Sequence, residues 1–132
     1  MVRVVFDTNV YLSAFSTEGA KSKRAFGMVK QGRVQLYVSV DILMETVGKL
    51  RDKFLMDDED ITIVLKSISR VATVIKADRK INLLADVPDN RILDCAVQAK
   101  AHLIVTGDKH LLGLKEYEGI GITTVSGFLY SV

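Results

Sequence analysis

The chain has little of what many binding sites are built from. Its 132 residues include no tryptophan, one cysteine, one proline and two histidines. The single Cys95 excludes an internal disulfide and a thiolate zinc cluster, and His102 and His110 are too few for a histidine metal site. No apolar stretch approaches the roughly 20 residues that span a bilayer. Disulfide-stapled folds, zinc-finger-like domains and membrane-spanning proteins are therefore excluded as classes.

Length and composition indicate one globular domain over residues 1–132. Hydrophobic residues make up 48% of the chain and charged residues 26%, which is the balance of an ordinary soluble domain with a buried core. The N-terminus opens directly on an apolar run, without the charged and hydrophobic regions of a signal peptide. We therefore expect a cytoplasmic protein that makes no use of a membrane.

The net charge of +2 gives no strong general attraction to nucleic acid. Basic residues nonetheless gather in two segments, near residues 21–33 and 49–53, which also fit ordinary solvated helix faces. If several acids are held in a metal site, the remaining surface is more basic than the total suggests. A phosphodiester substrate then becomes the better interpretation.

Apolar runs and turn residues alternate along the chain. Strands are predicted near residues 2–6, 34–38, 71–75, 102–106 and 121–125. Helices are predicted from about Tyr11, at 20–31, at 40–54 after the capping Ser39, after the acidic run 57–60, at 89–100 and at 126–130. The acidic run is expected to cap its helix rather than to bind metal. Strands that alternate with helices predict an α/β fold with a parallel sheet covered on both faces.

Two of the apolar runs end in an acid. Residues 2–6 lead into Asp7, and residues 102–107 lead into Asp108. Ligands bind outside the carboxyl ends of strands in an open parallel sheet, so these two carboxylates are expected to meet in one crevice. Carboxylates brought together repel unless a cation lies between them, and the usual cation is a divalent metal with oxygen ligands. Turn chemistry explains each acid nearly as well when it is taken alone.

Helical geometry separates the two acids that follow Pro88. At 100° per residue, the apolar positions 92, 93, 96 and 97 form one stripe of the predicted helix. Asp89 lies in line with the centre of that stripe at the helix N-terminus, so it is either an N-cap or a buried ligand. Asp94 lies roughly 130° away by the same helical count, which predicts that it faces solvent or supports the site from outside.

The helix predicted at 40–54 contains one more acid of interest. Glu45 projects away from the apolar stripe of this helix, which runs through Val40, Leu43, Val47, Leu50 and Phe54. Periodicity alone therefore predicts a surface glutamate.

Several segments resemble the PIN domain family, most of all its branch of toxin components from toxin–antitoxin systems. In chain order they are VVFDTNVYLSAF, SVDILMETVGKL, PDNRILDCAVQAKAHLIVTGDKHLL and a closing SGFL. The resemblance covers nearly the whole chain, although residues 55–85 contribute little to it. It implies a three-layer α/β/α sandwich with a mostly parallel central sheet, and a ribonuclease that depends on Mg²⁺ or Mn²⁺.

The resemblance also implies which residues form the site. The matching acids, catalytic and metal-binding, are Asp7, Glu45, Asp89 and Asp108, which reverses the surface interpretation of Glu45. Asp94 stands where many relatives of this branch carry glutamate, and it joins the metal-binding set as an outer member. A cognate antitoxin and homodimerisation are implied as well.

The implied mechanism is phosphodiester hydrolysis of RNA. The three strand-end and helix-start aspartates would hold the metal, which activates water and neutralises charge on the phosphate. Glu45 would hold a second ion or orient the attacking water. Asn9 and Thr106 would fix these carboxylates through hydrogen bonds. Lys109 and His110 could meet phosphate at the rim, although they also fit a solvated turn.

Two other functions stay open at this point. The Asp-Thr-Asn of residues 7–9 is similar to the Asp-x-Asp start of haloacid-dehalogenase phosphatases, but that chemistry needs an acid where Asn9 stands. A non-catalytic module that holds RNA or a protein partner is the other alternative. Few aromatic side chains are available to read bases, and the spacing of Tyr11 and Phe15 fits a core helix face better. We therefore expect weak sequence preference.

Overall fold

The computed structural model describes residues 1–78 and 80–132, and these form seven helices and six strands. The strands are β1 (Arg3–Phe6), β2 (Gln35–Ser39), β3 (Ala72–Ile75), β4 (Leu103–Val105), β5 (Glu116–Tyr117) and β6 (Ile120–Thr123). The helices are α1 (Thr8–Ala14), α2 (Ala20–Lys30), α3 (Val40–Asp52), α4 (Asp58–Val71), α5 (Val87–Ala99), α6 (Lys109–Leu114) and α7 (Val125–Ser131).

All six strands belong to one sheet with the order β3-β2-β1-β4-β6-β5. Every neighbouring pair is parallel except β5 and β6, which form a short antiparallel hairpin at one edge. The predicted mostly parallel sheet is therefore confirmed. The two-residue strand β5 was not predicted, because so short a segment has no periodicity to recognise.

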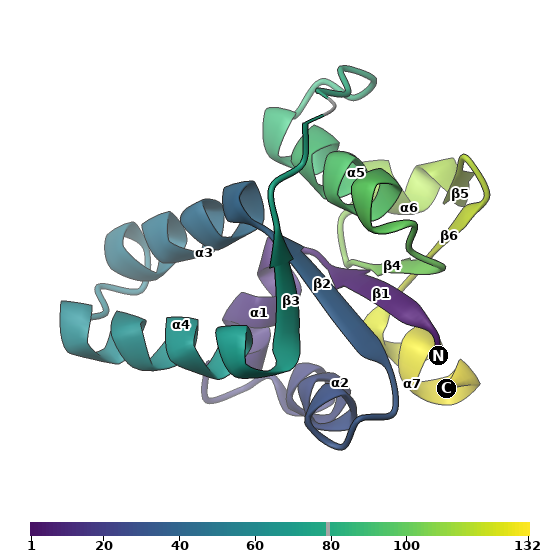
Figure 1. The fold of residues 1–132 in the computed structure, drawn as a ribbon. Helices are drawn as coiled ribbons and strands as arrows, with labels where there is room; N and C mark the ends of the chain where they lie inside the picture. The colour runs from purple at the N-terminus through teal and green to yellow at the C-terminus, as the bar shows by residue number, and fades with distance from the viewer. Residues whose placement is uncertain (79) are drawn as a thin grey trace.

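Helices cover both faces of the sheet, which gives the predicted three layers (Figure 1). Helix α5 packs on β1, β2 and β4, whereas α1 and α7 pack on the opposite face together with α2. The core contains the central strands, with Val4, Val5 and Phe6 of β1 fully buried. The connection from β1 leads outward to β2, and the chain returns from β3 across the sheet to β4. The topological switch point therefore lies between the carboxyl ends of β1 and β4.

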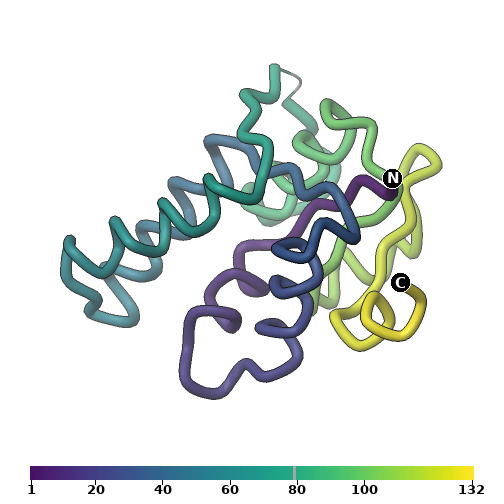
Figure 2. Tube along the Cα trace, turned by 60° about the horizontal axis from the view of Figure 1, so that its bottom comes forward, coloured from purple at the N-terminus to yellow at the C-terminus, as the bar shows by residue number. Residues whose placement is uncertain are grey.

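Helices α3 and α4 form a hairpin that projects beside the sheet, as Figures 1 and 2 both show. The predicted caps of these helices are confirmed. The Ser39 hydroxyl accepts a hydrogen bond from the backbone amide of Ile42 at 3.1 Å, and the Asp57 carboxylate accepts one from the amide of Asp60 at 2.9 Å. Among the described residues, no helix is long and apolar enough to cross a membrane.

The predicted buried face of α3 was wrong in part. Val40 and Phe54 are 45% and 51% exposed, whereas Ile42, Thr46 and Leu50 are buried. The buried row contains a polar residue, which a hydrophobicity pattern does not select. Burial is tolerated because the Thr46 hydroxyl donates a hydrogen bond to the Ile42 carbonyl at 2.8 Å.

Candidate active site

Asp7 and Asp108 meet at the switch point of the sheet, as their strand-end positions predicted. Asp7 directly follows β1, is buried, and its backbone amide donates a hydrogen bond to the Val105 carbonyl of β4 at 2.9 Å. Thr106 links the two acids. Its hydroxyl donates to Asp7 Oδ2 at 2.6 Å and accepts from the Asp108 backbone amide at 2.9 Å. The Thr106 side chain therefore lies where its predicted supporting role requires.

Helix capping accounts for only some of the hydrogen-bonding capacity of Asp7 and Asp108. The Asp7 side chain makes no capping hydrogen bond to α1, although Asp7 occupies the N-cap position. Asp108 does cap α6, but both capping bonds, from the amides of His110 and Leu111, go to Oδ1 at 2.8 and 3.1 Å. Oδ2 of Asp108 is left for another partner. Each carboxylate therefore keeps an oxygen that makes no hydrogen bond to the helix that follows it.

Asp89 enters the same region from the first turn of α5. Pro88 occupies the start of that helix, where its missing amide costs no hydrogen bond, and Asp89 is only 5% exposed. Within the described part of the chain, its Oδ2 is buried and accepts no hydrogen bond from an amide, hydroxyl or cationic group. The prediction that Asp89 points to the core side is confirmed. A buried carboxylate oxygen without a partner is costly, so it marks a place where a ligand is missing.

The negative charges of the three aspartates lie near enough to one another to shift the pKa values of Asp7 and Asp89. The pKa of Asp89 is raised to about 7, chiefly by burial and in addition by the negative charges of Asp108, Asp86 and Asp7. Burial and the charge of Asp108 also raise the pKa of Asp7, against the opposing effects of the Thr106 hydroxyl and the nearby Asn9 backbone amide. A bound cation would reduce the repulsion between these carboxylates.

The donor set is suited to a hard divalent cation. All the candidate ligands are carboxylate oxygens, the type that Mg²⁺ and Mn²⁺ prefer, and one of them is buried without a partner. Over residues 1–78 and 80–132, however, no three acidic, histidine or cysteine side chains are already close enough to enclose an ion. The chemistry of these ligands fits a divalent metal, although their side chains are not gathered around one point.

Glu45 lies apart from the three aspartates in its interactions. Its side chain is 27% exposed and forms an ion pair with Lys49, one turn further along α3, with 3.3 Å between Oε1 and Nζ. Glu45 is not among the charges that shift the pKa of Asp7 or Asp89. The structure thus places Glu45 neither on an open surface, as periodicity predicted, nor in direct contact with the aspartates.

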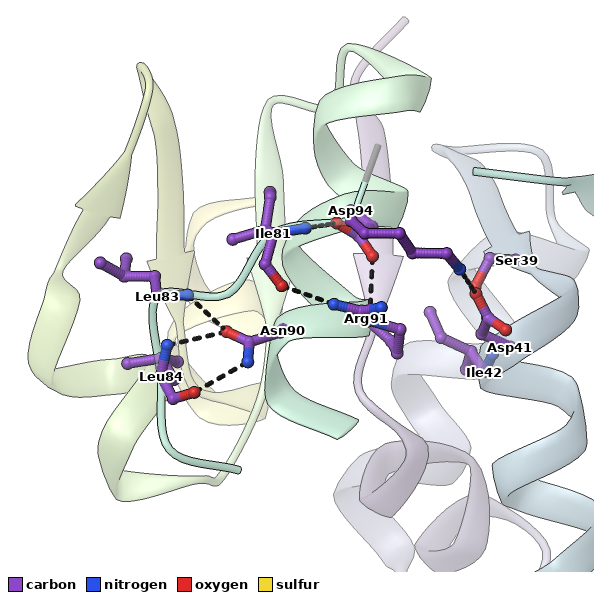
Figure 3. A network of polar contacts seen from close by, with 10 residues as sticks. Ser39, Asp41, Ile42, Ile81, Leu83, Leu84, Asn90, Arg91 and Asp94 are labelled. Carbon is purple, nitrogen blue, oxygen red and sulfur yellow. Dashed lines mark hydrogen bonds and ion pairs between the residues drawn. The ribbon is translucent and has the colours of Figure 1, made fainter. Parts of the chain in front are cut away.

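The solvent-facing interpretation of Asp94 was wrong, and the alternative of a supporting residue outside the site is the one that its contacts favour. Asp94 is fully buried, accepts a hydrogen bond from the Ile81 amide at 2.7 Å, and pairs with Arg91 at 2.9 Å between Oδ2 and Nε. Figure 3 shows Asp94, Arg91 and Ile81 joined in this network. The helical count failed because α5 has a second covered face, where the segment leading into it lies against the helix.

The same segment is held by Asn90. Its side-chain oxygen accepts hydrogen bonds from the amides of Leu83 and Leu84, and its nitrogen donates to the Leu84 carbonyl at 2.8 Å (Figure 3). Asn90 and Asp94 therefore fix the entry into α5, the part of the chain that leads to Asp89 immediately before Asn90. Asp94 supports the site through the backbone and is engaged at both oxygens, so it is not free to serve as a metal ligand.

The remaining sequence candidates divide into surface and core. Asn9, Lys109 and His110 are exposed, and no hydrogen bond from the Asn9 side chain to an acid is present. Tyr11 is fully buried against Phe6 with 5.8 Å between ring centroids, which confirms the core interpretation. Cys95 is buried as a small hydrophobe, and burial raises the pKa of its thiol to about 12.

Sequence reasoning missed Lys49 as part of the site. The sequence shows it only as one of the basic residues at 49–53, whereas in the structure it pairs with Glu45. Its charge lowers the pKa of Asp7, and its ammonium pairs with Glu45. The available signal was the spacing of four between Glu45 and Lys49, which places opposite charges side by side on a helix.

Comparison with solved structures shows that the fold is shared with known proteins. The fold is similar to a chain of the VapBC2 complex from Rickettsia felis, solved bound to a DNA fragment from its promoter, with a TM-score of 0.65, 16% identity, and coverage of 93% of this chain and 98% of that one. It is also similar to the PIN domain endonuclease Utp24, with a TM-score of 0.60, 19% identity, and coverage of 92% and 84%.

Sequence comparison carries the family assignment. Over 121 residues the chain is 31% identical to the uncharacterized protein MJ1680 of Methanocaldococcus jannaschii, covering 87% of this chain and 76% of that protein. Residues 3–110 match the family model described as PIN domain. That match contains all the candidate acids and removes the haloacid-dehalogenase alternative. The chain belongs to the PIN domain family.

Proposed function

We propose that this protein is a ribonuclease that depends on Mg²⁺ or Mn²⁺. The observation that carries the proposal is the buried, unpartnered Oδ2 of Asp89, held near two further aspartates at the switch point of the sheet. Membership of the PIN domain family and the fold shared with the endonuclease Utp24 support the same reaction class.

The three aspartates would hold the metal, and Glu45 would serve as an outer ligand or orient the attacking water. When bound, a divalent ion lowers the pKa of water and neutralises charge on the phosphate. Thr106 orients Asp7 by donating its hydroxyl proton to Oδ2, and its acceptor role fixes the backbone of Asp108. Asn9 would contact substrate rather than an acid, because its side chain is exposed beside the site.

Single-stranded RNA is the substrate we propose. A flexible strand can bend its phosphates toward acids that lie below the rim, whereas a duplex is stiff. The phenol ring of Tyr11 is packed in the core, so it offers no stacking surface to a base. Binding should therefore depend on phosphates, with strong salt dependence and weak sequence preference.

Cleavage of labelled single-stranded RNA in Mn²⁺ tests this function. Wild-type protein should cut, EDTA should stop it, and Asp89→Asn should be inactive while folded. Asp52→Asn, which changes an exposed acid at the end of α3, is the matched control and should cut normally. Preference for duplex DNA would overturn the ribonuclease assignment. RNA binding without any Mn²⁺-dependent cleavage would establish a non-catalytic binding module instead.

We further propose that the protein acts as the toxin of a toxin–antitoxin pair. The fold shared with a chain of the VapBC2 complex supports this role. A cognate antitoxin could insert a basic side chain among the acids, and a homodimer is consistent with the family. Expression should arrest growth, and co-purification from the native cell should recover the antitoxin. A free monomer that leaves growth unchanged would remove the toxin role without affecting the nuclease proposal.

A further inference from the structure

Lys49 is a positively charged side chain that pairs with Glu45, one of the candidate acids. It lies one turn after Glu45 on α3, with its ammonium 3.3 Å from the Glu45 carboxylate. Helix α3 packs against α1, the helix that begins immediately after Asp7. The side chains of Lys49 and Glu45 are only 29% and 27% exposed, so the pair is partly shielded from solvent on the helix that packs against α1.

The position of Lys49 gives it two acidic neighbours on different elements. Its charge also acts on Asp7, where it favours the ionised carboxylate. A lysine beside several acids takes the role of a counter-ion, which a divalent metal would otherwise fill. The chain thus holds a positive charge beside Glu45, the residue to which the proposed function gives the role of an outer ligand.

The pair with Glu45 is suited to being broken. Partly exposed ion pairs at a spacing of four on a helix contribute little to stability. A dication bound by the aspartates would attract Glu45 and repel the Lys49 ammonium. The long lysine side chain is flexible enough to turn toward the opening of the site, where phosphate arrives.

We propose that Lys49 is the exchangeable counter-cation of this site: it pairs with Glu45 before the metal binds, competes with the metal for that carboxylate, and then binds the substrate phosphate. The inference rests on the proposed nuclease function and assigns a phosphate-binding residue within it. Its consequence is that one substitution should change metal affinity and RNA affinity in opposite directions, which a merely structural lysine would not do.

The test compares Lys49→Met with wild type in two binding measurements. Mn²⁺ alone is titrated into the metal-free protein, and a labelled single-stranded RNA is titrated in Ca²⁺ to avoid cleavage. Lys49→Met should bind Mn²⁺ up to about fivefold more tightly, because a competitor worth less than about 1 kcal/mol is gone. It should bind RNA several-fold more weakly, with a salt slope reduced by about 0.7, the loss of one phosphate contact on a single strand.

Two further variants show whether the effect depends on the charge of Lys49 and on its position. Lys49→Arg preserves the charge and should retain RNA binding, whereas Lys66→Met removes an exposed lysine of α4 on the same hairpin and should leave Mn²⁺ affinity unchanged. Equal Mn²⁺ and RNA affinities in Lys49→Met and Lys66→Met would overturn the inference while wild-type cleavage kept the proposed function intact. Absence of Mn²⁺ binding by the wild type would instead remove the proposed function itself.

Discussion

Asp89 combines burial, a helix N-terminus and three acidic neighbours in a single side chain. Its pKa is raised from 3.8 to about 7, first by burial and then by the charges of Asp108, Asp86 and Asp7. A raised pKa means that the folded protein binds this proton more tightly than the unfolded chain does. The stabilisation is fully present below pH 3.8 and is lost as the pH rises to about 7.

This shift predicts the pH dependence of stability without metal. In EDTA, wild-type protein should lose melting temperature between about pH 4 and pH 7 relative to Asp89→Asn, because the uncharged amide carries no such penalty. Thermal melts of the two proteins across that range provide the measurement. Parallel curves for wild type and Asp89→Asn would show that Asp89 ionises freely in the fold.

The sequence predicted Asp89 correctly and Asp94 incorrectly for the same physical reason. A helical stripe locates one buried face, and Asp89 lies on it. Helix α5 has a second covered face, because Asn90 and Asp94 bind the backbone of residues 81–84. That contact joins segments with no apolar pattern of their own. Hydrogen bonds to a buried side chain leave no periodic signal in a sequence.

Asp94→Asn should therefore act on stability rather than on metal. The asparagine keeps the shape but leaves Arg91 facing an uncharged partner at a buried position, at a cost of about 2–3 kcal/mol. Urea denaturation should show this loss, while the Mn²⁺ affinity of the folded protein should remain near that of wild type. Loss of Mn²⁺ affinity with unchanged stability would restore Asp94 as a ligand.

At the scale of elements, local signals located the helices well. Ser39 and Asp57 are side-chain caps that mark where α3 and α4 begin, and both were visible in the sequence. The buried face of α3 was harder to predict from the sequence, because one of its buried residues is the polar Thr46. Capping depends on adjacent residues, whereas the choice of buried face depends on which elements pack on the helix.

Substitution of Asp57 tests whether side-chain capping stabilises the start of α4. Asp57→Ala should lower the free energy of unfolding by about 1 kcal/mol, because the amide of Asp60 loses its acceptor at the start of α4. Asp57→Asn supplies a similar cap and should remain close to wild type. Chemical denaturation of the three proteins distinguishes these outcomes, and equal losses in both variants would assign the effect to charge instead of capping.

At the scale of the whole molecule, strand order creates the site. Asp7 follows β1 and Asp108 follows β4, two strands that are neighbours in the sheet although about a hundred positions separate these acids in the chain. A right-handed parallel fold with a change of direction between these strands brings their carboxyl ends together. The alternation of strands and helices predicted that Asp7 and Asp108 lie close together. The contacts of residues 81–84 with α5 and the position of Lys49 could be found only from the structure.

The central claim is that Asp7, Asp89 and Asp108 form one divalent metal site, and Mn²⁺ titration of the metal-free protein tests it most directly. Free Mn²⁺ can be measured by electron paramagnetic resonance at pH 8, which is above the pKa of about 7 of Asp89. The account predicts that wild type and Asp52→Asn bind Mn²⁺ with equal affinity, and that Asp89→Asn, Asp7→Asn and Asp108→Asn each bind it far more weakly. Undiminished Mn²⁺ binding by folded Asp89→Asn would contradict the account.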